Sequence, residues 1–129
     1  MEKRIINPWK WQNDRNYAQA VEVKNAQSTL YVSGQTAIDE EGVTSDADMR
    51  TQILKTFENL EKVIVQADFE LKNIVRLNVY TTDHSAFFEN FDIWQHWITQ
   101  HGIQQASTVI EVKTLFETLK VEMKATVVK

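Results

Sequence analysis

The hydroxyl group of Ser107 stands where a neutral polar stretch meets an apolar one, in the sequence QQASTVI over residues 104–110. No lysine or arginine occurs in this run. A serine hydroxyl can donate one neutral hydrogen bond, and it cannot balance the charge of a buried carboxylate. Ser107 could therefore contact a polar ligand, but by itself it could not hold an anionic one.

Glu122 is a carboxylate that alternates with apolar residues in the sequence VEMKA near the C-terminus. Alternation of this kind is typical of a strand, where a charged side chain can face solvent or another subunit. A glutamate in a cleft could instead act as a general acid or base, provided that burial raises its pKa. Both interpretations of Glu122 stay open at this point.

Histidine and cysteine patterns argue against metal chemistry. The three histidines, His84, His96 and His101, show no HExxH or HxH spacing, and we expect no metal role for them. The chain has no cysteine, which excludes disulfides, thiolate nucleophiles and cysteine-based zinc sites. We therefore expect neither a metal nor another cofactor.

The composition fits a single globular domain over residues 1–129. A chain of this length buries enough apolar surface for a core without metal or disulfide support. The net charge is −4 and lysine and arginine form no cluster, so binding to nucleic acid is disfavoured. No apolar run approaches membrane-spanning length, and the N-terminal MEKRIINPWKW does not read as a signal peptide. We expect no membrane contact and a cytoplasmic location.

Apolar runs predict six β-segments, at residues 5–6, 21–24, 28–35, 73–82, 107–112 and 117–129. The polar sequence KNAQ separates the second segment from the third, so we expect these two to form a hairpin. Within the third segment, Leu30 and Val32 should face one side of the sheet and Ser33 the other.

Two amphipathic helices are predicted between these strands. Apolar residues recur every three or four positions over residues 46–67, and Ser45 with Asp48 fits the capping-box spacing at the start of this helix. A second helix is predicted over residues 84–100, with Asp83 as its N-cap. Each helix has one apolar stripe, which should pack against a sheet.

The element order β-β-β-α-β-α-β-β predicts an α+β fold, with two helices packed on one face of a mixed sheet. The chain has no third predicted helix to cover the other face. That face would leave apolar surface exposed in a monomer. We therefore expect a homo-oligomer with sheets packed around an axis.

Three sequences resemble the RidA (YjgF) family of reactive-intermediate deaminases, which also carries the older labels translation inhibitor and L-PSP endoribonuclease. They are LYVSGQTAID, FENLEKVIVQADFELKNIVRLNVYTTD and LKVEMKATVVK. The resemblance covers nearly the whole chain, from about residue 15 to residue 128. It implies a chorismate-mutase-like fold and a homotrimer with three ligand clefts between subunits.

The resemblance also implies which residues line each cleft. The matching positions are Tyr17 in NYAQAV, Ser33 and Gly34 in VSGQ, Asn90 in ENFDIW, Ser107 in QAST and Glu122 in KVEMK. Of these, Glu122 would be the catalytic residue and the other five would bind the ligand.

Ser107 departs from the family pattern, in which an arginine follows the alanine, as in PARS. That arginine holds the carboxylate of a 2-imino or 2-enamino acid in a bidentate contact while water attacks the imine carbon. Without it, efficient hydrolysis of 2-imino acids is not expected, although the fold and cleft should persist. Arg15 and Arg76 are alternative cations, and a solvated surface position is the simpler interpretation of both.

The resemblance leaves two functions open for a protein that binds a small metabolite. One is the hydrolysis of another enamine or imine, with release of ammonia. The other is ligand binding or regulation without turnover. Endoribonuclease activity has the least support, because the chain has no basic groove and no histidine pair for acid–base cleavage.

Overall fold

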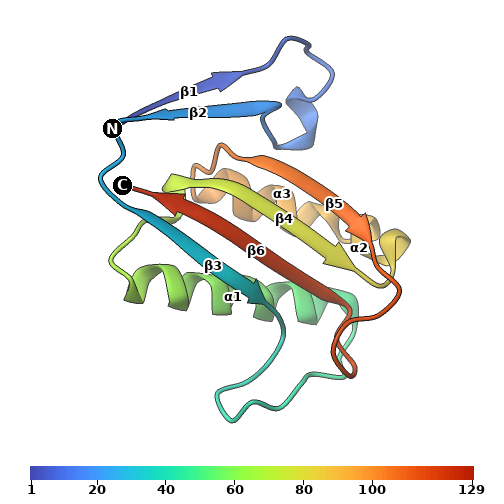
Figure 1. The fold of residues 1–129 in the computed structure, drawn as a ribbon. Helices are drawn as coiled ribbons and strands as arrows, with labels where there is room; N and C mark the ends of the chain where they lie inside the picture. Colours follow the sequence, from blue (N-terminus) through green and yellow to red (C-terminus); the bar gives the residue numbers. More distant parts are fainter.

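The computed structural model describes residues 1–129, and its centre is a four-stranded sheet with helices on one face (Figure 1). The strand order is β3–β6–β4–β5, formed by Thr29–Gln35, Val121–Val128, Ile74–Thr81 and Ala106–Glu111. Strand β6 pairs antiparallel with β3 and β4, whereas β5 pairs parallel with β4. The sheet is therefore mixed, and the predicted α+β fold class is confirmed.

Strand β2 (Ala20–Lys24) does not form the predicted hairpin with β3. It pairs antiparallel with β1 (Glu2–Ile6) in a separate two-stranded sheet, which Figure 1 shows beyond the edge strand β5. Strand β3 pairs instead with β6 from the far end of the chain. The hairpin prediction was wrong because it considered only strands that are neighbours in the sequence. Strand β6, from the far end of the chain, buries a complete apolar face beside β3 and pairs with it instead.

Helix α1 (Met49–Gln66) begins at Met49 and not at residue 46. Asp48 is its N-cap, because the carboxylate accepts a hydrogen bond from the backbone nitrogen of Thr51 at 2.9 Å. The hydroxyl of Ser45 instead accepts from the backbone nitrogen of Ala47 at 3.1 Å, which closes a turn before the helix. The predicted apolar stripe is buried, through Met49, Ile53, Phe57, Leu60 and Ile64.

The predicted helix over residues 84–100 is two helices, α2 (His84–Glu89) and α3 (Phe91–Gln100). Asn90 separates them, and its side-chain Nδ2 donates to the carbonyl of Ala86 at 2.8 Å. That carbonyl would otherwise accept from the backbone N–H of Asn90, so the side chain displaces one rung of the helix. The fold therefore has three α-helices, α1, α2 and α3, where two were predicted. None of them is long and apolar enough to cross a membrane.

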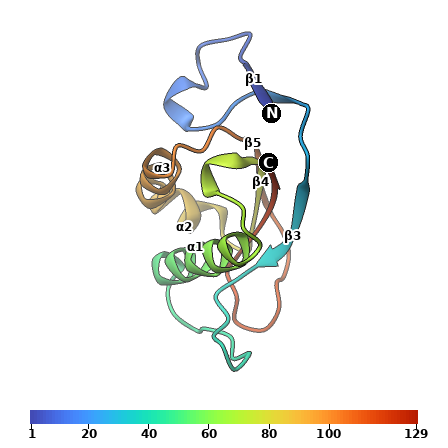
Figure 2. The ribbon, with the colours of Figure 1, turned by 90° about the vertical axis from the view of Figure 1, so that its left-hand side faces the viewer.

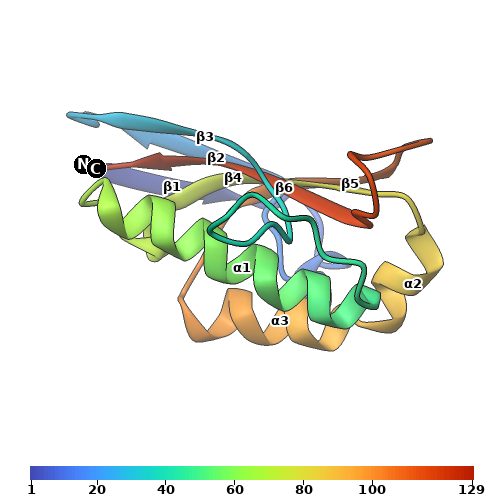
Figure 3. The same cartoon turned by 90° about the horizontal axis from the view of Figure 1, so that it is seen from below.

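Alternate residues of the central strands pack against the helices. Leu77, Val79, Val121 and Met123 are fully buried on this face. Figure 2 and Figure 3 show all three helices on one side of the sheet, and the opposite face carries no helix. On that open face the side chain of Tyr31 is 80% exposed and Ile110 is 44% exposed.

Candidate functional site

Ser107 lies on β5 with its side chain on the face of the sheet that the helices cover. In the parallel pairing it stands beside Leu77, which is fully buried against the helices. Because β5 is an edge strand, Ser107 is only half-buried. Its hydroxyl is accessible at the margin between the sheet and the helical layer.

Tyr17 is placed beside β5 by the chain that follows a single-turn 3-10 helix, Asn13–Arg15. Asn16 adopts a left-handed conformation with φ of 58°, which ends that turn. The backbone nitrogen of Ala18 then donates to the carbonyl of Gln105 at 2.8 Å. This backbone contact fixes the segment carrying Tyr17 next to the start of β5.

Tyr17 and Ser107 line one pocket of about 800 Å³, which we call the Ser107 pocket. Its walls come from the N-terminal segment, the edge strand β5 and the helices α2 and α3. Its apolar lining includes Phe88, Phe91 and Trp94. The structure thus brings together two of the residues that the sequence predicted for a ligand cleft.

The three aromatic rings form a continuous wall of the Ser107 pocket. The ring centroids of Phe88 and Phe91 are 5.2 Å apart, and those of Phe91 and Trp94 are 6.4 Å apart. Phe88 is 41% exposed whereas Trp94 is 2% exposed, so the wall runs from solvent into the core. The three aromatics recur every third residue, a spacing in the sequence that could have indicated one shared face.

Arg15 also lines the Ser107 pocket, although its side chain is exposed. Its guanidinium carbon lies 5.2 Å from the ring centroid of Trp11, within the range of a cation–π contact. Trp11 in turn stacks on Trp9, with ring centroids 5.9 Å apart. Arg76 is exposed on the open face of β4, opposite to the face that carries Ser107.

Gln105 is a polar residue of this region that the sequence did not single out. It is completely buried. Its Nε2 donates to the carbonyl of Asn16 at 2.9 Å and to the hydroxyl oxygen of Ser107 at 3.0 Å. Its position in a neutral polar run gave no signal, because burial depends on the N-terminal segment that folds over it.

Gly34 and Glu122 form a second group, on β3 and β6. A β-carbon at Gly34 would lie 2.7 Å from both Cδ and Oε2 of Glu122, so the carboxylate lies directly over the glycine. Ser33 precedes this position and is exposed. The Glu122 side chain makes no ion pair or hydrogen bond within the chain, which leaves its carboxylate available for contacts from outside.

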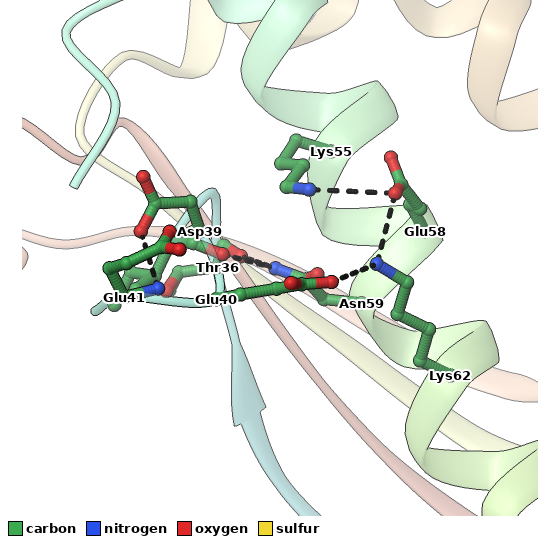
Figure 4. A network of polar contacts seen from close by, with 9 residues as sticks. Thr36, Asp39, Glu40, Glu41, Lys55, Glu58, Asn59 and Lys62 are labelled. Atoms are coloured by element: carbon green, nitrogen blue, oxygen red, sulfur yellow. Dashed lines mark hydrogen bonds and ion pairs between the residues drawn. The ribbon is translucent and has the colours of Figure 1, made fainter. Parts of the chain in front are cut away.

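A polar network holds the chain segment that follows Gly34 (Figure 4). Asn59 of α1 donates to the carbonyls of Thr36 and Ile38, at 2.8 and 2.9 Å. Lys62 contacts Glu58 at 3.2 Å, and this hydrogen bond lowers the pKa of the Glu58 carboxyl. Helix α1 thereby anchors the end of β3.

Asn90 belongs to neither group. Besides the bond to its own helix, its Oδ1 accepts from Arg50 of α1 at 3.3 Å. Arg50 also holds Asp92 of α3, with Nη2 and Oδ2 3.0 Å apart, and this hydrogen bond lowers the pKa of Asp92. Both ends of the Asn90 side chain are thus engaged in joining the helices.

The two groups of predicted site residues lie apart in one chain. Strands β3 and β5 are opposite edges of the sheet. Ser107 is on the helix-covered face, whereas Glu122 pairs with Tyr80 on the open face. No cluster of three or more metal-ligating side chains is present either. The arrangement offers a pocket with hydroxyl groups in one place and an unpaired carboxylate in another.

Comparisons with known proteins agree on one family. A family model described as Endoribonuclease L-PSP matches residues 11–129. A RutC family protein of Aquifex aeolicus is 29% identical over 113 residues, which cover 88% of each chain. The structure is similar to that of the Rid family protein YyfB from Yersinia pestis, with a TM-score of 0.88, 26% identity and complete coverage of both chains. Escherichia coli TdcF with bound serine is similar at a TM-score of 0.72 and 22% identity, covering 96% of this chain and 90% of that chain.

Proposed function

The chain belongs to the RidA (YjgF) family, and on that premise we propose that it binds a small metabolite in clefts between the subunits of a homotrimer. The separation of the two groups of site residues carries this proposal. Tyr17 and Ser107 lie at the β5 edge of the sheet, whereas Gly34 lies on the opposite edge strand β3 and Glu122 on the neighbouring strand β6. Copies whose open faces pack around a shared axis would bring the Glu122 carboxylate of one subunit toward the edge strand β5 and the Ser107 pocket of the next.

The chemistry proposed for this cleft is the hydrolysis of an enamine or imine. Water adds to the imine carbon, the nitrogen takes a proton, and ammonia leaves as the carbonyl forms. Glu122 would accept the proton of the attacking water and return it to the departing nitrogen. This role requires that the carboxylate oxygens can reach water and substrate, and no ion pair or hydrogen bond within the chain occupies them.

A 2-imino acid is a poor substrate in this proposal. Its carboxylate would meet Ser107 in place of an arginine, and a neutral hydroxyl cannot compensate for the desolvation of the charge. Loss of one partner of a buried charge pair weakens binding by on the order of 2–5 kcal/mol. Arg15 is the only pocket cation, and it is exposed and packed on Trp11.

The test is ammonia release from a panel of freshly generated enamines and imines, with and without a carboxylate. The wild type should act on uncharged members, and Glu122→Gln should lower the rate by roughly 10²- to 10⁴-fold, the usual contribution of a general acid or base. Glu89→Gln, at an exposed position on α2, is the matched control. Ser107→Arg should add activity on 2-imino acids. Ammonia no higher than in buffer across the panel would end the enzymatic proposal.

Ligand binding without turnover is the second candidate, and one observation favours it. No neighbouring side chain hydrogen-bonds to Glu122 or orients it, as the base of an efficient enzyme would require. In that case a ligand should raise the melting temperature and be recovered unchanged.

Endoribonuclease activity remains the least supported function, given the net charge of −4. Intact single-stranded RNA after incubation with the protein is the expected result.

A further inference from the structure

The side-chain amide of Gln105 is held in one orientation. A backbone carbonyl can only accept hydrogen bonds, and the Asn16 carbonyl lies 2.9 Å from Nε2. The amino end of Gln105 must therefore face Asn16, and its second hydrogen points to the Ser107 oxygen at 3.0 Å. Reversing the amide would set its oxygen against the Asn16 carbonyl and lose that bond inside a completely buried site.

This orientation determines what the hydroxyl of Ser107 can do. Its oxygen already accepts a hydrogen bond from Gln105, and its own proton is given to no other group of the protein. Since Ser107 lines the pocket, that proton is available to a ligand there. The ligand atom that uses this proton is an acceptor, such as a carbonyl oxygen.

The rest of the Ser107 pocket selects for a neutral ligand with a flat apolar body. Phe88, Phe91 and Trp94 present ring surface along one side. Flat apolar groups stack well on such rings. Arg15 is exposed, and its neighbour Asp14 also lines the pocket with the opposite charge, so the pocket carries no net charge for an anion.

We propose that the Ser107 pocket binds a neutral carbonyl compound with a planar apolar body, and that Gln105 is the positioning residue that makes Ser107 a hydrogen-bond donor to it. This inference rests on the proposed function of the same pocket and defines its ligand class. The carbonyl accepts from Ser107, and the planar body lies against the aromatic wall. An amide, ester or ketone has the required neutral carbonyl group, which we call the head group, whereas a free carboxylate does not.

Benzamide and benzoate test the head group, because they share shape and ring but differ in charge. Titration calorimetry at neutral pH should show benzamide binding at least about tenfold more tightly, since the pocket offers one neutral donor and no buried cation. Acetamide, which has the head without the ring, should bind at least about tenfold more weakly than benzamide.

Substitutions separate the positioning role of Gln105 from a structural one. Ser107→Ala should weaken benzamide binding by about fivefold, the worth of one ordinary hydrogen bond, while Ser107→Thr should retain it. Gln105→Met should reduce the ratio of benzamide to benzoate affinity, a quantity that simple loosening of the fold would not change. If Gln105→Met does not fold, the comparison of the alanine and threonine variants at position 107 still decides the role of the hydroxyl.

Two outcomes would overturn the inference. One is benzoate binding as tightly as benzamide; a loss of that binding in Arg15→Gln would then identify Arg15 as the anion partner. The other is that neither aromatic probe binds. Ammonia release from imines distinguishes these failures from failure of the proposed function, since hydrolysis can persist without a neutral-carbonyl preference, and benzamide can bind without hydrolysis.

Discussion

At the scale of single residues, Gly34 makes room for the carboxyl group of Glu122. The glycine is not in a left-handed conformation, so backbone freedom does not explain it. Its missing β-carbon does, because the Glu122 carboxyl group occupies that space. Gly34 and Glu122 therefore form one structural unit in this chain.

Gly34→Ala should displace the Glu122 side chain with little loss of stability. The new methyl group would meet the flexible end of a side chain, which can move, and no backbone strain arises. We expect a melting temperature close to that of the wild type together with loss of any activity or binding that depends on Glu122. Gly42→Ala is the control with the opposite pattern. Gly42 has a φ of 81°, which an alanine adopts only with strain, and no atom lies near its missing β-carbon. This variant should therefore lose about 1 kcal/mol of stability while function persists. A fully functional Gly34→Ala protein would contradict a role for Glu122.

At the scale of elements, the contact between α1 and the start of α3 keeps the aromatic wall in place. Arg50 reaches from α1 to Asn90 and Asp92, on either side of Phe91. Phe91 contributes directly to the Ser107 pocket. The position of Asn90 therefore matters to the site through the helices it joins, even though its side chain does not line the pocket.

Asp92→Asn should lower stability at neutral pH and have less effect in acid. The hydrogen bond from Arg50 lowers the pKa of Asp92 in the folded state, so the folded protein binds this proton less readily than the unfolded chain does. The stabilisation is thus present above the usual aspartate pKa of about 4 and is lost as the pH falls through the lower folded value. Melting temperatures measured from neutral pH down to strongly acidic pH should show the two proteins converging. Asp46→Asn, at an exposed residue without an ion pair, is the control. A constant difference at all pH values would exclude the ion pair as the cause.

At the scale of the whole molecule, one face of the sheet is left without a helical layer. Tyr31 and Ile110 are exposed there, and Asn78 on the same face has a buried Oδ1 without a partner. A monomer would leave the apolar surface exposed to water and the polar atom without a hydrogen-bond partner. Packing of this face against other copies would explain both features.

Light scattering should give the mass of three chains for the wild type. Ile110→Glu should lower that mass, because a charge on the open face would be buried without a partner in the assembly. Leu54→Glu is the matched control, since Leu54 is 51% exposed on helix α1 and away from that face. A trimer that tolerates Ile110→Glu, or a monomeric wild type, would argue against subunit clefts built on the open face.

The sequence by itself determined the features that depend on neighbours along the chain. Alternation in β6 and the apolar stripe of α1 were predicted from their periodicities, and Asp83 was correctly predicted as the N-cap of α2. The lack of a lysine or arginine in the run around Ser107 was also visible in the sequence. Each of these signals is local, because helix and strand geometry repeat every few residues.

Only the tertiary structure decided which residues meet. It replaced the predicted hairpin by the pairing of β2 with β1, and it showed that Asn90 interrupts a helix. It also placed the buried side chain of Gln105 in hydrogen-bond contact with Ser107, and no residue spacing in the sequence predicted this contact. The physical reason is that long-range pairing and burial depend on the total apolar surface that the whole chain can remove from water, and no local window contains that quantity.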